Sequence, residues 1–463
     1  SEAHGSMQEK LLHHTSTCQG YHDAEAPHAL LDRLTSKHAS KATWQNVTAA
    51  LLSLQLGWGL WLFPADFARL GWLPAPAILV LLASLTAYSS VLFTRLYTAV
   101  PGTVLFSDVG HAAAGRWGSN LVSLIVYSLD ATRCVILHLA ATQSLRHMWL
   151  PGPDQPTLWQ CGLAVMVVSC LLSQLRSMTE MTWVFVGGTA AQLVAVVIVL
   201  AELIFHPNPD AKTETCAVTT PDTWAPAAVA CMNMIFAFGG QFAFIEVMGT
   251  MSKPQDFPKA ATVCTAVMAC LYAGLGVVGY WSRGAGVEDI VVFALPPSRR
   301  SQLAAGCILA QALAQYLINI NVWVHNLLVL GARFRKTGRA DDTPQPTIST
   351  DHCRWLWLGT SSFVVVYSCV ISVSLPFFAT LVGLVTSVTY LACAYTLPAW
   401  FALKLLGARL GGFEKCLLIA IIPASVCVSA IGLWGSIIAL ISDVGGGEGW
   451  GNTILAAWGL QVN

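Results

Sequence analysis

Residues 236–250, FAFGGQFAFIEVMGT, resemble a membrane-spanning helix that is interrupted at its centre. Gly239 and Gly240 lie between aromatic runs, and Gln241 and the carboxylate of Glu246 follow them. Glycine is about 1 kcal/mol less favourable than alanine inside a helix, and a charged side chain is costly in the bilayer core. A helix that only had to cross lipid would need neither, so this stretch predicts unwound backbone within a membrane.

The composition of the whole chain places it in the membrane class. Of its 463 residues, 55% are hydrophobic and only 10% are charged, whereas a soluble domain is about 25% charged. The formal net charge is zero, which points to no nucleic-acid partner. The 14 cysteines lie mostly in apolar runs without metal-ligand spacing. We therefore expect an all-α integral membrane protein without a metal or a cofactor.

Eleven apolar segments are long enough to cross a bilayer, which takes roughly 20 residues. They lie near residues 43–70, 72–97, 118–148, 158–175, 181–205, 226–250, 260–282, 301–331, 355–374, 377–403 and 416–441. The transporter domain is thus expected over residues 42–441. It lies between a polar N-terminal arm, residues 1–41, and a short C-terminal tail, residues 442–463.

The distribution of lysine and arginine predicts the orientation. If the N-terminus is cytoplasmic, 17 of the 24 lysines and arginines fall on the inner side and six on the outer side, with Arg133 inside a span. Positive charge concentrates on the cytoplasmic side of membrane proteins. We therefore expect a cytoplasmic N-terminus and an extracellular C-terminus. Separately, we expect a plasma-membrane location and a monomer.

A second interrupted span occurs at residues 51–72, LLSLQLGWGLWLFPADFARLGW. Gly57 and Gly59 flank Trp58, and Pro64 follows, so the helix should unwind near residues 56–60. Each interrupted span opens a group of five: residues 43–205 form the first repeat, residues 226–403 the second, and residues 416–441 an extra helix. Five is odd, so the two repeats run with opposite topology.

Broken helices at matching positions of two inverted repeats point to a substrate site at the membrane midplane of a secondary transporter. Freed amides at a half-helix N-terminus can bind a carboxylate, and freed carbonyls can bind an ammonium or a cation. The alternative is that the glycines only allow close helix packing.

Several motifs resemble those of the amino acid/auxin permease family, and most closely its plant-type amino acid permeases and auxin influx carriers. They are LFPADFARLGW (62–72), FAFGGQFAFIEVMGTMSKPQDFPKA (236–260) and VPGTVLFSDVGHAAAG (100–115). The resemblance implies a LeuT-type five-plus-five inverted repeat with broken helices 1 and 6. It also implies uptake of amino acids or related acids coupled to protons or sodium.

Two positions depart from the family pattern. Auxin influx carriers have a histidine after the glycine pair, where this chain has Gln241, and an amide does not take up a proton near neutral pH. Sodium-coupled members have an asparagine four residues before the first Gly-x-Gly, where this chain has Ser53, a poorer cation ligand. The sequence therefore favours proton coupling.

Three charged residues are predicted deep inside spans: Asp130, Arg133 and Glu246. Asp130 and Arg133 are three residues apart, so we expect them on one helix face as a pair. That pair is either a static ion pair or a contact to the charge of the substrate. Glu246 is either a structural carboxylate held by unwound backbone or the group that carries the coupled proton. Asp130 is the second proton-coupling candidate.

The predicted function is secondary active transport of amino acids, by proton symport and with alternating access. The predicted substrate-binding residues are Ser53, Gly57, Trp58, Gly59, Tyr127, Phe236, Phe238, Gly239, Gly240, Gln241 and Asn319. The alternatives are an auxin-like indole-acid carrier, a sodium-coupled amino acid transporter and a nutrient-sensing transceptor. The chain has no HExxH, GxSxG or P-loop motif, so no catalytic residues are predicted.

Overall fold

The computed structural model describes residues 42–149, 155–174, 178–208, 215–219, 224–293, 295–337 and 350–445. Within these ranges the chain is helical, apart from loops and one isolated β-bridge between Ala42 and Met251. The predicted N-terminal arm, residues 1–41, and the tail beyond residue 445 lie outside the described residues.

The helices account for the predicted spans. In chain order they are α3 (Trp44–Gln55), η1 (Trp58–Leu62), α4 (Phe63–Leu70), α5 (Pro74–Ala99), α6 (Phe106–His147), α7 (Leu158–Leu172), α8 (Met178–Phe205), α9 (Ala225–Ala237), η3 (Gln241–Ala243), α10 (Phe244–Gly249), η4 (Pro254–Asp256), α11 (Phe257–Arg283), η5 (Gly284–Gly286), α12 (Arg299–Thr337), α13 (Thr350–Ser374), α14 (Phe378–Val385), the π-helical turns η6 (Thr386–Tyr390) and η7 (Ala392–Thr396), α15 (Leu397–Leu405) and α16 (Gly412–Gly445).

Nine helical stretches in the described residues are long and apolar enough to cross a membrane. A tenth is the pair Trp44–Gln55 and Trp58–Leu70, which is bent by 54° at its break. The shorter apolar helix α7 corresponds to the predicted span at residues 158–175. The prediction of an all-α integral membrane protein is therefore confirmed.

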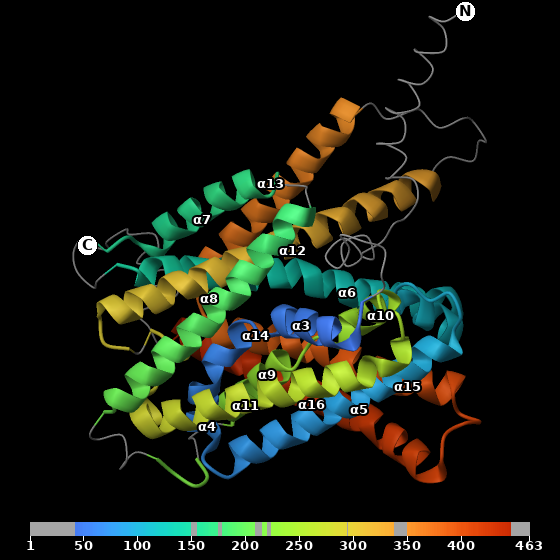
Figure 1. Cartoon of the computed structure of the whole chain (residues 1–463), viewed down its shortest axis with the longest axis horizontal. Helices are drawn as coiled ribbons and strands as arrows, with labels where there is room; N and C mark the ends of the chain where they lie inside the picture. Colours follow the sequence, from blue (N-terminus) through green and yellow to red (C-terminus); the bar gives the residue numbers. More distant parts are fainter. Residues whose placement is uncertain are drawn as a thin grey trace, which may run out of the picture.

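Two groups of helices organise the molecule (Figure 1). In the first group, which we call the bundle, α11 packs against α3, α4 and α5, and α4 packs against α9. In the second group, the scaffold, α12 and α13 pack against α6, and α7 packs against α6 and α13. Helix α8 lies along α12, and α14 and α16 pack against α9. Both broken spans thus belong to the bundle.

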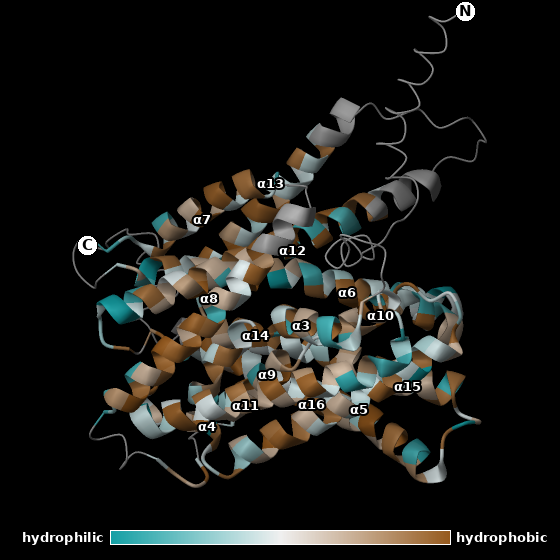
Figure 2. Cartoon of the chain, in the orientation of Figure 1, coloured by the Kyte–Doolittle hydropathy of each residue, from teal (hydrophilic) through white to brown (hydrophobic). Residues whose placement is uncertain are grey.

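The ribbons of the helices are mostly hydrophobic in colour, with hydrophilic residues at helix ends and loops and in a few places within helices such as α6 (Figure 2). In the most apolar stretch of α16 only 17% is buried inside the protein, compared with 78% in that of the span Phe378–Leu405. In water, such an exposed apolar surface would favour aggregation, but in a bilayer it faces lipid. Helix α16 is therefore peripheral.

Helix α6 begins earlier than the predicted span at residues 118–148. It starts at Phe106 and kinks at Ala114 and Gly115, where Gly115 has a φ of 65°. A positive φ is easily reached only by glycine. The turn at Gly115 therefore separates a short first segment from the long helix that crosses the scaffold.

Candidate functional site

The first span is broken between Gln55, the last residue of α3, and Trp58, the first residue of η1. Among the described residues, the backbone amides of Gly57, Trp58 and Gly59 donate no hydrogen bond. The carbonyl of Leu56 accepts a hydrogen bond from Gln311 Nε2, and that of Gly57 accepts one from Gln192 Nε2, each at 3.3 Å. The break thus presents three free donors at the start of a half-helix, as expected of an anion site.

The second break, in the sixth span, lies between Ala237, the end of α9, and Gln241, the start of η3. The Ala237 carbonyl accepts a hydrogen bond from the Tyr272 hydroxyl at 2.8 Å. Within the described part of the chain, the carbonyls of Phe238 and Gly239 accept none. This break therefore offers free acceptors where the first offers free donors.

Gln241 stabilises the broken backbone itself. Its Oε1 atom accepts a hydrogen bond from the Gly240 amide at 2.8 Å, and its Nε2 atom donates to Thr86 Oγ1 at 3.4 Å. The side chain is 1% exposed. Both ends of this amide are thus bound to protein groups.

The glycines at the breaks also allow close packing. A Cβ atom on Gly59 would lie 2.7 Å from the Cβ of Ala237, and one on Gly57 would lie 2.9 Å from Gln315 Oε1. A Cβ atom on Gly239 would collide with the Tyr390 ring. Free backbone groups and close approach therefore occur at the same glycines, and neither alternative raised by the sequence excludes the other.

A cavity lies between the two breaks. Its described lining consists of Leu54, Gln55, Gly57, Trp58, Gly59, Arg133, Ile136, Leu137, Phe236, Ala237, Gly239, Gln315 and Tyr390. Five predicted substrate-binding residues are in this lining, namely Gly57, Trp58, Gly59, Phe236 and Gly239. The structure thus brings both glycine motifs together with the scaffold helices α6 and α12 around one space.

The other predicted substrate-binding residues are not in that lining: Ser53, Tyr127, Phe238, Gly240, Gln241 and Asn319. Phe238 is buried against the ring of Tyr272, with ring centroids 5.2 Å apart. The ring centroids of Tyr127 and Trp323 are 5.9 Å apart. Asn319 Nδ2 donates a hydrogen bond to the carbonyl of Gln315 at 2.8 Å. These side chains are engaged in packing or helix contacts.

The predicted Asp130–Arg133 ion pair is not formed among the described residues. Asp130 Oδ2 instead accepts a hydrogen bond from Asn326 on α12 at 2.9 Å. The Arg133 guanidinium lies over the Phe242 ring, 5.2 Å from its centroid. Spacing along α6 placed both residues on one face, but the long arginine side chain extends toward the cavity.

Glu246 lies outside the cavity, where α10 meets the beginning of α6. Its Oε1 atom accepts a hydrogen bond from the amide of Phe106, the first residue of α6, at 3.3 Å. Its Oε2 atom is buried and has no hydrogen-bond partner in the described structure. Glu246 therefore links α10 of the bundle, through one carboxylate oxygen, to the short first segment of α6 that precedes the turn at Gly115.

Comparison with known proteins agrees with this arrangement. Residues 40–442 match the family model described as transmembrane amino acid transporter protein. This chain belongs to that family. Among its Arabidopsis thaliana relatives, amino acid transporter AVT1D is 23% identical over 401 residues, covering 84% of this chain and 68% of the relative. Amino acid transporter AVT3B is 22% identical over 422 residues, covering 87% and 94%.

The fold of this family member is also found among solved structures. The crystal structure of MhsT in complex with L-phenylalanine superposes with a TM-score of 0.57 at 14% identity, covering 86% of this chain and all of that one. The predicted LeuT-type fold and family membership are thus confirmed.

Sequence reasoning missed several residues at the site of this transporter family member. Gln55 and Gln315 line the cavity, while Gln192 and Gln311 bond the broken backbone. Each is an amide in an apolar span, a signal that the sequence offered, because polar residues inside a membrane mark functional sites. Tyr390 could not have been found this way, because the π-helical turn that positions it has no sequence signature here.

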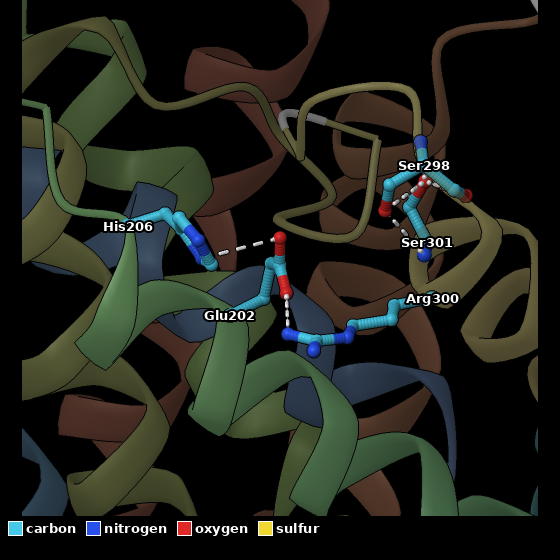
Figure 3. Close-up of polar contacts among 5 residues, drawn as sticks. All are labelled: Glu202, His206, Ser298, Arg300 and Ser301. Carbon is cyan, nitrogen blue, oxygen red and sulfur yellow. Dashed lines mark hydrogen bonds and ion pairs between the residues drawn. The ribbon is translucent and has the colours of Figure 1, made fainter.

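A polar cluster lies far from the cavity, where α8 ends and α12 begins (Figure 3). Glu202 lies between His206 and Arg300, with nitrogen–oxygen distances of 3.4 Å to each. The Ser298 amide donates to Ser301 Oγ at 2.9 Å, and the Ser301 amide donates to Ser298 Oγ at 3.1 Å. This reciprocal cap fixes the start of α12 beside the end of α8.

Proposed function

We propose that this protein is a secondary active transporter of amino acids. The observation that carries the proposal is the pair of breaks, with the free amides of Gly57–Gly59 and the free carbonyl of Gly239 at one cavity. The amides suit an α-carboxylate and the carbonyl suits an α-ammonium. The relatives, named amino acid transporters, and the neighbour bound to L-phenylalanine support the same substrate class.

Alternating access would proceed by movement of the bundle against the scaffold around this cavity. Of the cavity-lining residues, Gly57 and Gly239 belong to the bundle, whereas Arg133 and Gln315 belong to scaffold helices. A motion between the two groups would therefore open the site on one side at a time.

Proton symport is the coupling that we propose, with Glu246 as the proton carrier and Asp130 as the second candidate. Glu246 joins α10 of the bundle to the short segment of α6 that leads into the scaffold helix, and one of its oxygens has no partner among the described residues. Protonation would remove the negative charge that accepts the Phe106 amide and would weaken this link. A proton could thus control a contact between the bundle and the segment that leads into the scaffold.

Transport by purified protein in liposomes tests both proposals. Uptake of radiolabelled amino acids should rise as external pH falls and should be unaffected when choline replaces sodium. Glu246→Gln should retain exchange of internal for external substrate but lose accumulation against a gradient. Glu414→Gln is the matched control, because Glu414 pairs with Arg95 away from the cavity. Sodium-dependent uptake at constant pH, or full accumulation by Glu246→Gln, would contradict the coupling scheme.

An indole acid is the second candidate substrate, because Trp58, Phe236 and Tyr390 line the cavity. Including indole-3-acetate in the same substrate panel tests this candidate directly.

We also propose a plasma-membrane location with a cytoplasmic N-terminus. A terminal epitope that is detected only after the cells are permeabilised, together with surface biotinylation, would support that orientation and location.

A further inference from the structure

Arg133 is the one charged side chain in the described lining of the cavity. It lies on α6, in the scaffold, and its guanidinium lies over the face of Phe242 at 5.2 Å from the ring centroid. Among the described residues it has neither an ion-pair partner nor a hydrogen-bonded side chain. An arginine at membrane depth is costly unless a partner compensates its charge.

The buried carboxylates of the neighbourhood are bound elsewhere. Asp130 accepts a hydrogen bond from Asn326, and Glu246 accepts one from the Phe106 amide. Asp66 accepts a hydrogen bond from Asn233 at 3.1 Å. None of the three is in the described cavity lining. Asp130 is close enough to Arg133 for their charges to attract each other, but it forms no ion pair with it and lies outside the cavity lining. A direct carboxylate partner for Arg133 within the cavity is therefore left to the substrate.

The backbone groups at the breaks already match the two charged groups that every amino acid carries. The free amides of Gly57, Trp58 and Gly59 suit the α-carboxylate, and the free Gly239 carbonyl suits the α-ammonium. Arg133 is then available for a third charged group, on the side chain of the substrate. Its planar guanidinium fits a carboxylate through two parallel hydrogen bonds.

We propose that Arg133 binds the side-chain carboxylate of the substrate, and that this transporter selects acidic amino acids over neutral ones. Ile136 and Leu137, on the same helix, line the cavity beside Arg133 and would contact the methylene groups of such a side chain. The inference rests on the proposed amino acid transport and adds the charge class of the substrate to it.

Glutamate and glutamine provide the test, because they have nearly the same size and shape and differ in side-chain charge. Initial uptake of each radiolabelled amino acid is measured in liposomes containing the full chain. The wild type should take up glutamate at least about tenfold more efficiently than glutamine, because glutamine leaves the arginine in the cavity without a charged partner. Arg133→Gln should lose that preference, with glutamate uptake falling by a larger factor than glutamine uptake.

Two further variants separate recognition from folding. Arg133→Lys keeps the charge but not the planar fork, so it should retain a weaker preference for glutamate. Arg146→Gln is the matched control, because Arg146 lies on the same helix but outside the cavity lining. It should leave the preference unchanged. Gel filtration of each purified variant establishes that it is folded.

The outcomes distinguish this inference from the proposed function. Wild-type protein that transports glutamine at least as well as glutamate overturns the inference and leaves amino acid transport intact. Equal loss of both substrates in Arg133→Gln overturns it too, because Arg133 would then act on a group that both amino acids share. Uptake of indole-3-acetate without uptake of any amino acid overturns the proposed function itself. If Arg133→Gln and Arg133→Lys both misfold, the preference of the wild type decides.

Discussion

Gly59 lies against Ala237 where the two broken helices approach each other, and a Cβ atom on Gly59 would lie 2.7 Å from the Cβ of Ala237. The same glycine has one of the free amides of the first break. A side chain at this position would therefore both separate the two breaks and cover the approach to the amides. Gly274 on α11 has the opposite environment, because a Cβ atom there would meet no atom within 4 Å.

We predict that Gly59→Val abolishes amino acid uptake while the protein still reaches the membrane. Gly274→Val should reduce uptake only slightly, because an isolated valine in a helix is tolerated. Uptake in liposomes and ligand-dependent thermal stabilisation measure the two effects. Wild-type uptake by a folded Gly59→Val protein would show that the breaks do not form the site.

Asp130 and Asn326 form the other informative pair at the residue scale. The Asp130 carboxylate is 4% exposed and accepts its hydrogen bond from Asn326 across the interface of α6 and α12. Asn326→Leu removes the donor and leaves a buried carboxylate, which should cost about 1–3 kcal/mol of stability. Asp130→Asn should cost less, because the amide oxygen can still accept. Thermal unfolding of both purified variants checks this order, and a larger loss for Asp130→Asn would contradict it.

At the scale of elements, the beginning of α12 is fixed by the reciprocal cap of Ser298 and Ser301 (Figure 3). Helix α12 carries Gln311, which bonds the first break, and Gln315, which lines the cavity. The cap satisfies amides that a helix N-terminus otherwise leaves without partners. The stability of this terminus thus bears on how accurately the two glutamines are placed.

We predict that Ser298→Ala destabilises the protein by about 1 kcal/mol, the usual cost of losing such a cap. Ser84→Ala is the control, because the Ser84 hydroxyl is exposed and bonds only the carbonyl of Val80 on its own helix. Thermal melting in detergent should place Ser298→Ala below both the wild type and Ser84→Ala. Equal melting temperatures for the two variants would exclude a capping role.

At the scale of the whole molecule, residues 287–293 connect the bundle to the scaffold. Asp289 forms an ion pair with Arg69 on α4, and the Val291 amide donates to the carbonyl of Trp61 at 3.2 Å. Phe293 stacks on His147 at the end of α6, with ring centroids 3.8 Å apart. One loop therefore contacts both of the groups that alternating access would move.

We predict that Arg69→Gln loosens the loop of residues 287–293. The conformation in which the cavity is open on the side of this loop should then become more populated. Hydrogen exchange of peptides that cover residues 284–293 should become faster, while exchange in the middle of α5 should not change. Asp289→Asn removes the same ion pair but leaves Arg69 beside the buried Asp66, so it should make exchange in the loop faster as well. Unchanged exchange in Arg69→Gln would show that the ion pair does not hold the loop.

The sequence by itself determined the membrane class, the spans and the positions of the two breaks. These features depend on local chemistry. An apolar run of sufficient length must lie in lipid, and glycines such as Gly57, Gly59, Gly239 and Gly240 weaken a helix wherever they occur in it. The inverted repeat followed from counting spans between the breaks, and the LeuT-type fold was implied by the resemblance of the motifs to a known family.

Tertiary structure alone decided which side chains meet at the site. Spacing along α6 predicted that Asp130 and Arg133 would pair, yet Asp130 bonds Asn326 and Arg133 extends to the cavity. Gln241 was expected at the substrate but bonds the adjacent amide of Gly240. Helical spacing fixes the face on which a residue lies, but it does not fix its partner, because that partner comes from a distant helix whose packing no local pattern records.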